Sequence, residues 1–285
     1  WQADQLLLSF MLLFTAPLHL LRKTKAFQAL LGSRLNNPKL YELGYSHRVA
    51  LRPFTHASIR WRRQQLEPGI NKLVTNIAKE LDNQNDQGWF FDVGANVGLY
   101  TWEVRMVCPN RNILAFEPDP ENIKLLEKTL AKANLQNLEI CQSALSNQAG
   151  EASFFQDTLT SATGCVGGND KPWIELYLNG SSNEIRVKTK TLESVVIESR
   201  TPSLIKIDVE GHEVEVLQGG RNVLSEAKPL LIIESFPPKQ STVLSLLNEL
   251  GYRSMDADHH TSINSKTTNL IACLLYTSDA ADDSL

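Results

Sequence analysis

The sequence predicts an α/β fold in which a mostly parallel sheet carries helices on both faces. Short apolar runs alternate along the chain with segments whose apolar residues recur at helical spacing, which is the pattern of strand–helix–strand units. One such run, Trp89–Val93, leads through a glycine-rich turn into a helix-like stretch. The 285 residues are 42% hydrophobic, so the chain is long and apolar enough to bury one full α/β core.

The individual elements follow from the spacing of apolar residues and from the Gly and Pro residues between them. Five strands are expected to form the parallel sheet: Trp89–Val93, Ile113–Glu117, Leu138–Ser143, Leu204–Val209 and Leu230–Ser235. Helices are expected over Ile70–Leu81, up to Val107, around Ile123, Leu126 and Leu130, over Glu213–Leu224, and up to Leu250. Further strands are expected at His47–Arg52, Glu151–Gln156, Ile185–Lys190, Tyr252–Met255 and Thr268–Ala272, with a loop at Thr158–Gly168.

The turn after the first of these five strands contains Gly94, Asn96 and Gly98, and Asp92 precedes it. Gly94 and Gly98 lack a Cβ, so the backbone can turn sharply there and approach a ligand closely. In α/β sheets this position binds nucleotide cofactors. The spacing differs from the G-x-G-x-x-G of dinucleotide sites, and Asp92 would repel a pyrophosphate but attract an ammonium group. The turn therefore favours S-adenosylmethionine (SAM) over NAD.

Glu117 ends the second strand, roughly 20 residues beyond the turn, where a carboxylate accepts hydrogen bonds from ribose hydroxyls. Because NAD and SAM both contain ribose, Glu117 indicates a nucleoside without distinguishing between them. The alternative interpretation is a carboxylate at a helix N-terminus that the helix dipole stabilises.

The chain resembles the FkbM-type SAM-dependent methyltransferases in the segments FDVGANVGLYT, AFEPDPENIKLLEKTL, CQSALSNQAGEASFF, LIKIDVEGHEVEVLQGG and LLIIESF. The resemblance covers about residues 45–272. It implies a class I methyltransferase, Rossmann-like fold with a seven-stranded sheet. It also implies SAM as methyl donor and, as acceptor, a hydroxyl group of a sugar or a polyketide-like natural product.

The resemblance also implies roles for individual residues. The methionine portion of SAM would contact Asp92, Gly94, Asn96 and Gly98, and Glu117 would bind the ribose. Ser143 and Ala144 would lie near the adenine. The acceptor would lie at the second acidic motif, Asp208–Glu213, which follows the strand Leu204–Val209.

A hydroxyl acceptor has to lose a proton, and Asp208, Glu210 and His212 are the candidate general bases. His212 titrates near neutrality, although a histidine at the start of a helix is more often a cap or a packed side chain. Carboxylates in and after the motif could alternatively gather around Mg²⁺ or Ca²⁺, and these are Asp208, Glu210, Glu213 and Glu234. We expect no metal, because Glu213 is also suited to the first turn of its helix.

Two other classes of function stay open. A nicotinamide-dependent oxidoreductase would use a similar sheet, but the chain lacks a G-x-G-x-x-G sequence. A SAM-binding module without catalysis is the third class, and the intact acidic motif argues against it.

Charge is distributed unevenly along the chain. Residues 1–63 contain ten Lys/Arg and two Asp/Glu, although the net charge of the whole chain is −4. We expect this basic arm to dock on the acidic remainder rather than to attract an anionic substrate or a membrane, and we expect no nucleic-acid partner. The apolar run Leu6–Leu21 is shorter than the ~20 residues of a membrane helix. We expect a helix packed on the catalytic domain, with an interfacial or a truncated membrane helix as alternatives.

The sequence suggests three parts: an N-terminal extension over 1–68, a SAM-dependent methyltransferase domain over 69–272, and a tail over 273–285. We interpret the tail as a sequencing-adapter scar, because CLLYTSDAAD resembles a translated adapter. The four cysteines form no C-x-x-C pair, which indicates a reducing compartment and predicts a cytoplasmic protein. The loop Asp157–Gly180, with Trp173 and Tyr177, is expected to shape the acceptor pocket.

Overall fold

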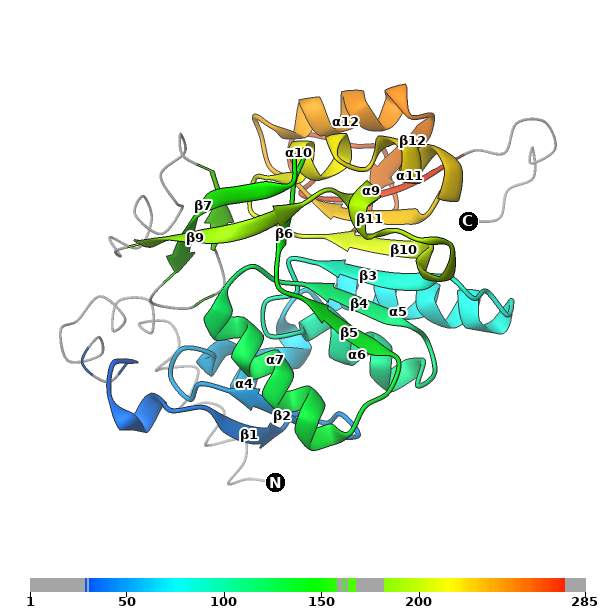
Figure 1. The fold of residues 1–285 in the computed structure, drawn as a ribbon. Helices are drawn as coiled ribbons and strands as arrows, with labels where there is room; N and C mark the ends of the chain where they lie inside the picture. The colour runs from blue at the N-terminus through cyan, green and yellow to red at the C-terminus, as the bar shows by residue number, and fades with distance from the viewer. Residues whose placement is uncertain (1–28, 30, 158–160, 162–163, 168–181, 275–285) are drawn as a thin grey trace.

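The computed structural model describes residues 29, 31–157, 161, 164–167 and 182–274. Its centre is a seven-stranded sheet of order β12-β13-β11-β10-β3-β4-β5 (Figure 1). The strands are β3 (Trp89–Val93), β4 (Ile113–Phe116), β5 (Leu138–Cys141), β10 (Pro202–Ile207), β11 (Leu230–Glu234), β12 (Tyr252–Asp256) and β13 (Asn269–Leu274). Neighbours from β11 to β5 are parallel, and β13 runs antiparallel to β11 and β12. The prediction of a mostly parallel seven-stranded α/β sheet is confirmed.

Two apolar clusters cover the two faces of this sheet. One contains side chains of α5 (Pro68–Asn83), α6 (Leu99–Val107) and α7 (Pro120–Ala133). The other contains side chains of α9 (Leu192–Val195), α10 (Glu213–Gln218), α11 (Arg221–Ala227) and α12 (Gln240–Glu249). Successive residues of a strand point to opposite faces, so Phe90 belongs to the first cluster and Phe91 to the second. Helices on both faces explain why the strand sequences are continuously apolar.

The helix that the sequence predicts over Glu213–Leu224 is divided into α10 and α11. Gly219 and Gly220 lie between the two helices. A Cβ on Gly219 would lie 2.0 Å from the carbonyl oxygen of Ser146, so the chain passes this backbone too closely for any other residue. The single-helix prediction was therefore wrong at the glycine pair.

The N-terminal described residues pack on the same core as the main sheet and its helices. β1 (Lys39–Glu42) and β2 (Arg48–Leu51) form an antiparallel pair, followed by α4 (Ala57–Arg62). Short 3-10 helices precede β1 at Arg34–Asn36 and follow α4 at Arg63–Gln65, and a third lies before β10 at Glu198–Arg200. The Ala50 N–H donates to Thr129 Oγ1 of α7 (2.9 Å), and Val49–Leu51 are fully buried. The run Leu6–Leu21 lies outside the described residues, among which no helix is long and apolar enough to cross a membrane.

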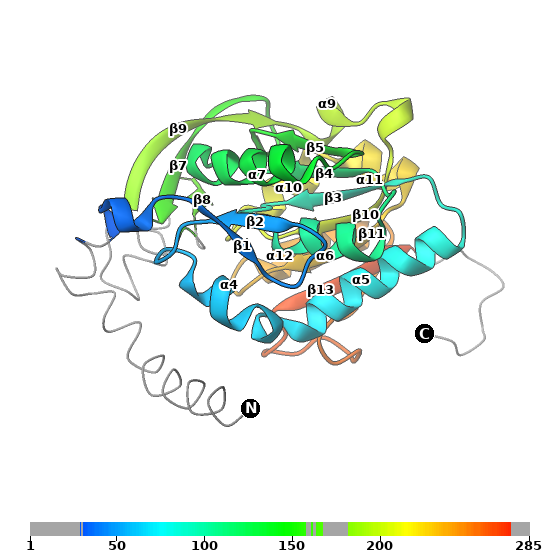
Figure 2. The same cartoon turned by 90° about the horizontal axis from the view of Figure 1, so that it is seen from below.

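A second, four-stranded sheet of order β6-β9-β7-β8 lies beside the main sheet. It comprises β6 (Ala144–Leu145), β7 (Gly150–Asp157), β8 (Cys165–Val166) and β9 (Ser182–Lys190). Figure 2 shows β7 and β9 as long curved strands near α7, where Gln156 Nε2 donates to Asp119 Oδ1 (2.8 Å). The sequence predicts β7 and β9 as strands but assigns β8 to a loop. Trp173 and Tyr177 lie outside the described residues.

Candidate active site

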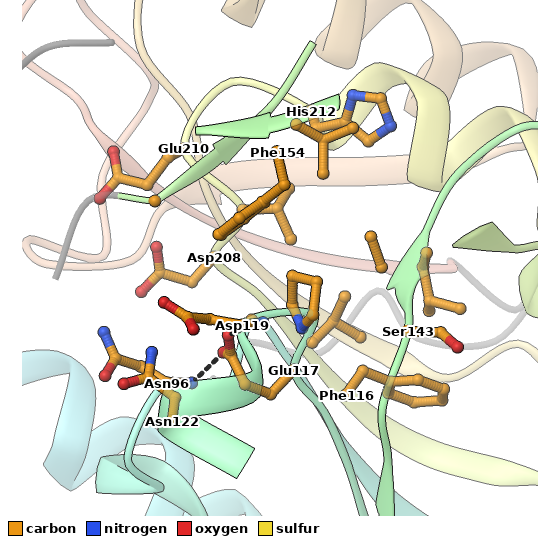
Figure 3. Close-up of a pocket in the computed structure, with 18 of the residues that line it drawn as sticks. Asn96, Phe116, Glu117, Asp119, Asn122, Ser143, Phe154, Asp208, Glu210 and His212 are labelled. Carbon is orange, nitrogen blue, oxygen red and sulfur yellow. Dashed lines mark hydrogen bonds between the residues drawn. The ribbon is translucent and has the colours of Figure 1, made fainter. Parts of the chain in front are cut away.

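An open cavity lies at the carboxyl ends of β3, β4 and β10, beside β6 (Figure 3). Its empty space, including the part open to solvent, is about 560 Å³. The polar residues that line it are Asn96, Glu117, Asp119, Asn122, Asp208 and Glu210. The apolar residues that line it come from both sheets and include Phe116, Ala144, Leu145, Phe154 and Val166. The carboxyl ends of neighbouring parallel strands are where α/β folds bind ligands.

The glycine turn is fixed by its contacts with two neighbouring strands. Gly94 has φ +84°, and a Cβ there would lie 1.8 Å from the carbonyl oxygen of Asp208. The N–H groups of Gly94 and Ala95 both donate to the carbonyl oxygen of Phe116 (3.0 and 2.9 Å). Gly98 has φ +89°, and a Cβ there would lie 2.6 Å from Trp102 Nε1. Both positions therefore require glycine for steric as well as conformational reasons.

Asn96 and Glu117 form the polar end of the cavity. Asn96 has φ +52°, and its backbone N–H donates to Glu117 Oε2 (2.7 Å). Its side-chain Nδ2 donates to the Ser161 carbonyl (2.7 Å), while its buried Oδ1 has no hydrogen-bond partner among the residues that the structure describes. Glu117 Oε1 accepts from the Asp119 N–H (2.8 Å), and burial raises the pKa of Glu117 to about 8. An unpaired acceptor and a nearly neutral carboxyl group thus face one cavity, where they can bind hydroxyl or ammonium groups.

The structure does not bring Asp92 and Gly98 to the cavity wall. Asp92 is 1% exposed, and its Oδ2 accepts from the Thr101 N–H and Oγ1 (2.9 and 2.6 Å). Its pKa is raised to about 6, mainly by burial. Asp92 therefore secures the first turn of α6, and Gly98 lets the chain enter that helix.

Ser143 and Ala144, which the family resemblance places near the adenine, both line the cavity beside its apolar residues. Ser143 Oγ donates to the Gln142 carbonyl (2.7 Å), and Ala144 begins β6. The sequence did not identify Phe154 and Val166 as site residues. Both come from the second sheet, whose position the strand pattern of Glu151–Gln156 alone does not indicate.

Asp208, Glu210 and His212 line the opposite side of the cavity (Figure 3). Lys206 Nζ lies 3.4 Å from Asp208 Oδ2. Glu210 has φ +52°, and burial together with the charge of Asp208 raises its pKa to about 8. Two carboxyl groups, of which Glu210 has a raised pKa, therefore line the cavity where the acceptor is expected.

His212 is held by two side chains and is not free to move. Its Nε2 lies 3.0 Å from Ser146 Oγ, and its Nδ1 lies 3.5 Å from Glu215 Oε2. Burial lowers the pKa of His212. This geometry does not favour His212 as a proton acceptor, because its ring nitrogens face protein groups.

The metal alternative gains no support. Among the described residues, no group of three or more His, Cys, Asp or Glu side chains is arranged to hold a metal ion. Glu213 Oε1 instead accepts from the Gly211 N–H (2.7 Å), as a carboxylate at the start of a helix does.

Comparison with known proteins agrees with the geometry. A curated relative, the hexuronic acid methyltransferase AglP of Haloferax volcanii, is 27% identical over 78% of this chain and 84% of its own length. The methyltransferase sdnD of Sordaria araneosa is 25% identical over 64% of this chain and 80% of its own length. A solved methyltransferase FkbM from Methylobacillus flagellatus is 18% identical, with a TM-score of 0.45, over 66% of this chain and 44% of that chain.

A family model described as the methyltransferase FkbM domain matches residues 92–254. The matched region begins at Asp92, contains every residue that the sequence predicts for the site, and covers more than half of the chain. The predicted family is thereby confirmed: the chain belongs to the FkbM methyltransferases.

Proposed function

We propose that this methyltransferase transfers a methyl group from SAM, the donor that its family implies, to a hydroxyl group of a sugar or a similarly polar small molecule. One observation carries the proposal. Asn96 and Glu117 at the glycine turn line the same cavity as Asp208 and Glu210 beyond β10. A nucleoside-binding end and an acid–base end thus adjoin each other, as transfer from a nucleoside donor to a hydroxyl acceptor requires.

The cavity residues suit SAM in polarity and charge. Phe116, Ala144 and Phe154 provide an apolar wall for the adenine, and Glu117 provides a carboxyl group for the ribose hydroxyls. The unpaired Asn96 Oδ1 can accept from a ribose hydroxyl or from the ammonium of the methionine portion. The carboxyl groups at the opposite end complement the positive sulfonium. Asp92 acts as a positioning residue that fixes the turn through Thr101.

When bound, SAM supplies a methyl carbon that is already activated for displacement. The protein then has to align the acceptor, exclude water and take up the acceptor's proton. We assign the proton to Asp208, because its carboxylate borders the cavity and Lys206 lies 3.4 Å from it. Glu210 orients the acceptor beside it. His212 packs against Ser146 and supports the loop instead of accepting the proton.

A sugar acceptor is supported by the relative from Haloferax volcanii, whose name specifies hexuronic acid. The hydroxyl acceptor itself is our inference from the carboxyl groups, which can accept a hydroxyl proton. Residues 69–272 form the proposed catalytic domain, and residues 49–51 also pack on its core. A cytoplasmic location stays a prediction from cysteine usage, and the expectation of no nucleic-acid partner stays a prediction from charge.

Calorimetric titration with S-adenosylhomocysteine (SAH), the demethylated product, tests the donor. The wild-type protein should bind SAH and not NADH. Glu117→Ala should lower the SAH affinity at least ~10-fold, because the hydrogen bonds of its carboxyl group to ribose and to the Asn96 and Asp119 N–H groups are lost. Glu139→Ala is the matched control, since Glu139 lies on β5 and pairs with Arg200 away from the cavity. A folded wild-type protein that does not bind SAH would contradict the proposal, and an acceptor screen with hexoses and hexuronic acids would follow a positive result.

A further inference from the structure

A layer of ionisable side chains lies on one face of the main sheet, directly behind the cavity. Lys206 and Asp208 lie two residues apart on β10 and its continuation, so they point to the same face. Asp92 is the register partner of Lys206 on β3, and Glu234 lies two residues beyond the Lys206 partner Ile232 on β11. We call these four residues, Asp92, Lys206, Asp208 and Glu234, the ionisable layer.

The helices over this face close the layer from the other side. Tyr100 of α6 donates its hydroxyl hydrogen to Glu67 Oε2, which lies at the start of α5. Lys206 Nζ lies 5.0 Å from the centroid of the Tyr100 ring. The groups that face Glu234 are therefore Asp208 and Lys206 on the sheet and Glu67 and Tyr100 on the helices.

Negative groups outnumber positive ones in this layer. Its single ammonium, Lys206, is 0% exposed and has no hydrogen-bond partner in the described part of the chain, although Asp208 Oδ2 lies 3.4 Å away. Three carboxyl groups share that ammonium, and Glu67 adds a fourth nearby. Buried carboxylates of like charge cannot all remain ionised, so the layer has to hold protons.

The pair Asp208 and Glu234 is the place for such a proton. Asp208 and Glu234 directly follow the register partners Ile207 and Ile233 on neighbouring parallel strands, and burial together with the charge of Asp208 raises the pKa of Glu234 to about 9. Two carboxyl groups can form a hydrogen bond only if one of them is protonated. Asp208 lines the cavity and lies beside Lys206, whereas Glu234 is not among the described residues that line the cavity. The proton therefore resides on Glu234, the member of the pair with the raised pKa.

We propose that Glu234 is a further positioning residue of the methyl-transfer site, which shares one proton with Asp208 in the free protein and releases it when the positively charged donor binds. This inference rests on the proposed function. The sulfonium brings a positive charge to a cavity bordered by Asp208 and Glu210, and a positive charge nearby favours the ionised form of a carboxyl group.

Methyl transfer then reverses the change. The acceptor oxygen forms a bond to the methyl carbon while the carbon–sulfur bond breaks. The electron pair of the broken carbon–sulfur bond stays on sulfur. The acceptor's proton moves to Asp208, which shares it with Glu234. The cavity loses the sulfonium charge and gains a proton in the same reaction, so its net charge is the same before and after transfer.

SAM and SAH differ by one methyl group and one positive charge, so they are matched probes of this idea. We would titrate the full chain with each at pH 7.5 in phosphate and in Tris buffer. The difference in heat between the buffers measures the protons released. No acceptor is needed, so the readout does not depend on activity. SAM should release roughly half a proton or more beyond the release with SAH.

Variants assign this release to a residue. Glu234→Gln cannot titrate and should abolish most of the difference between SAM and SAH, with SAH affinity within about threefold of wild type. Glu234→Asp should restore it. Glu210→Gln should keep at least half of it, and Glu249→Gln, a remote residue paired with Arg221, should keep all of it. Thermal unfolding of each variant verifies that it is folded.

Equal proton release with SAM and SAH, or an undiminished difference in folded Glu234→Gln, would overturn the role of Glu234 and leave the proposed function intact. Absence of binding by either compound to the folded wild-type protein would overturn both.

Discussion

Replacement of Gly94 by alanine tests whether the glycine turn and the acidic motif depend on direct backbone contact. The added Cβ would lie 1.8 Å from the carbonyl oxygen of Asp208, and 2.8 Å from its carbonyl carbon. No flexible side chain can move aside there, so β10 or the turn has to shift. Such overpacking costs about 1–3 kcal/mol. The left-handed backbone, with φ +84°, adds about 1 kcal/mol for a residue other than glycine.

The expected loss of unfolding free energy for Gly94→Ala is therefore about 2–4 kcal/mol, measured by urea denaturation. Gly167→Ala is the matched control, because Gly167 also has a positive φ (+125°) but a Cβ there would meet none of the described residues within 4 Å. The control should lose only about 1 kcal/mol. SAH affinity should fall more than ~10-fold in Gly94→Ala and stay unchanged in the control. Equal losses of stability in the two variants would refute the steric reasoning.

Three further predictions concern individual site residues. Burial raises the pKa of Glu117 to about 8, so the folded protein binds this proton more tightly than the unfolded chain, and stability should fall as pH rises from about 5 to 8. Glu117→Gln should flatten that decline by up to about 1.4 kcal/mol per pH unit in denaturation curves, and an unchanged slope would show that other groups cause it. Asp208→Asn should lower kcat about 10²–10⁴-fold and retain the SAH affinity of the wild type. His212→Asn should change kcat less than ~5-fold. A larger loss of kcat in His212→Asn than in Asp208→Asn would make His212 the base. Phe154→Ala should weaken SAH binding about 5–10-fold, because it removes part of the apolar wall of the cavity. Val187→Ala should leave SAH binding unchanged, because Val187 belongs to the same small cluster but does not line the cavity. Equal effects of the two variants would mean that the second sheet affects binding only through its stability.

The strands of the main sheet could be predicted to within one or two residues, because most of them, such as β4 and β11, are largely apolar runs bounded by Gly, Pro or polar residues. The break between α10 and α11 could not be predicted. It lies at Gly219, where the chain passes close to the backbone of Ser146, a residue that is distant in sequence. β8 is two residues long and has too few residues to show a period.

Most of the candidate site could be predicted, because its residues follow strands whose carboxyl ends meet at one edge of the sheet. Asp92 and Asn96 illustrate the limit. Both are polar and belong to one motif, yet Asp92 points under the sheet to Thr101 while Asn96 faces the cavity. Lys206 was missed because a lysine in an apolar strand carries no local signal. Its role depends on Asp208 and Glu234, which only the sheet order brings next to it.

The position of β3 explains why donor and acceptor sites adjoin. β3 lies between β4 and β10, so the chain crosses from one half of the sheet to the other at this strand, which is where α/β folds form ligand crevices. The turn after β3 bonds through Gly94 and Ala95 to Phe116 of β4, and the Asp208 N–H donates to the Val93 carbonyl (2.9 Å). The groups proposed to bind the donor and the group proposed to take the acceptor's proton are therefore joined by three backbone hydrogen bonds. Because rigid placement of both reactants contributes several kcal/mol to such a displacement, we infer that this backbone network matters as much for the rate as the carboxyl groups that it carries.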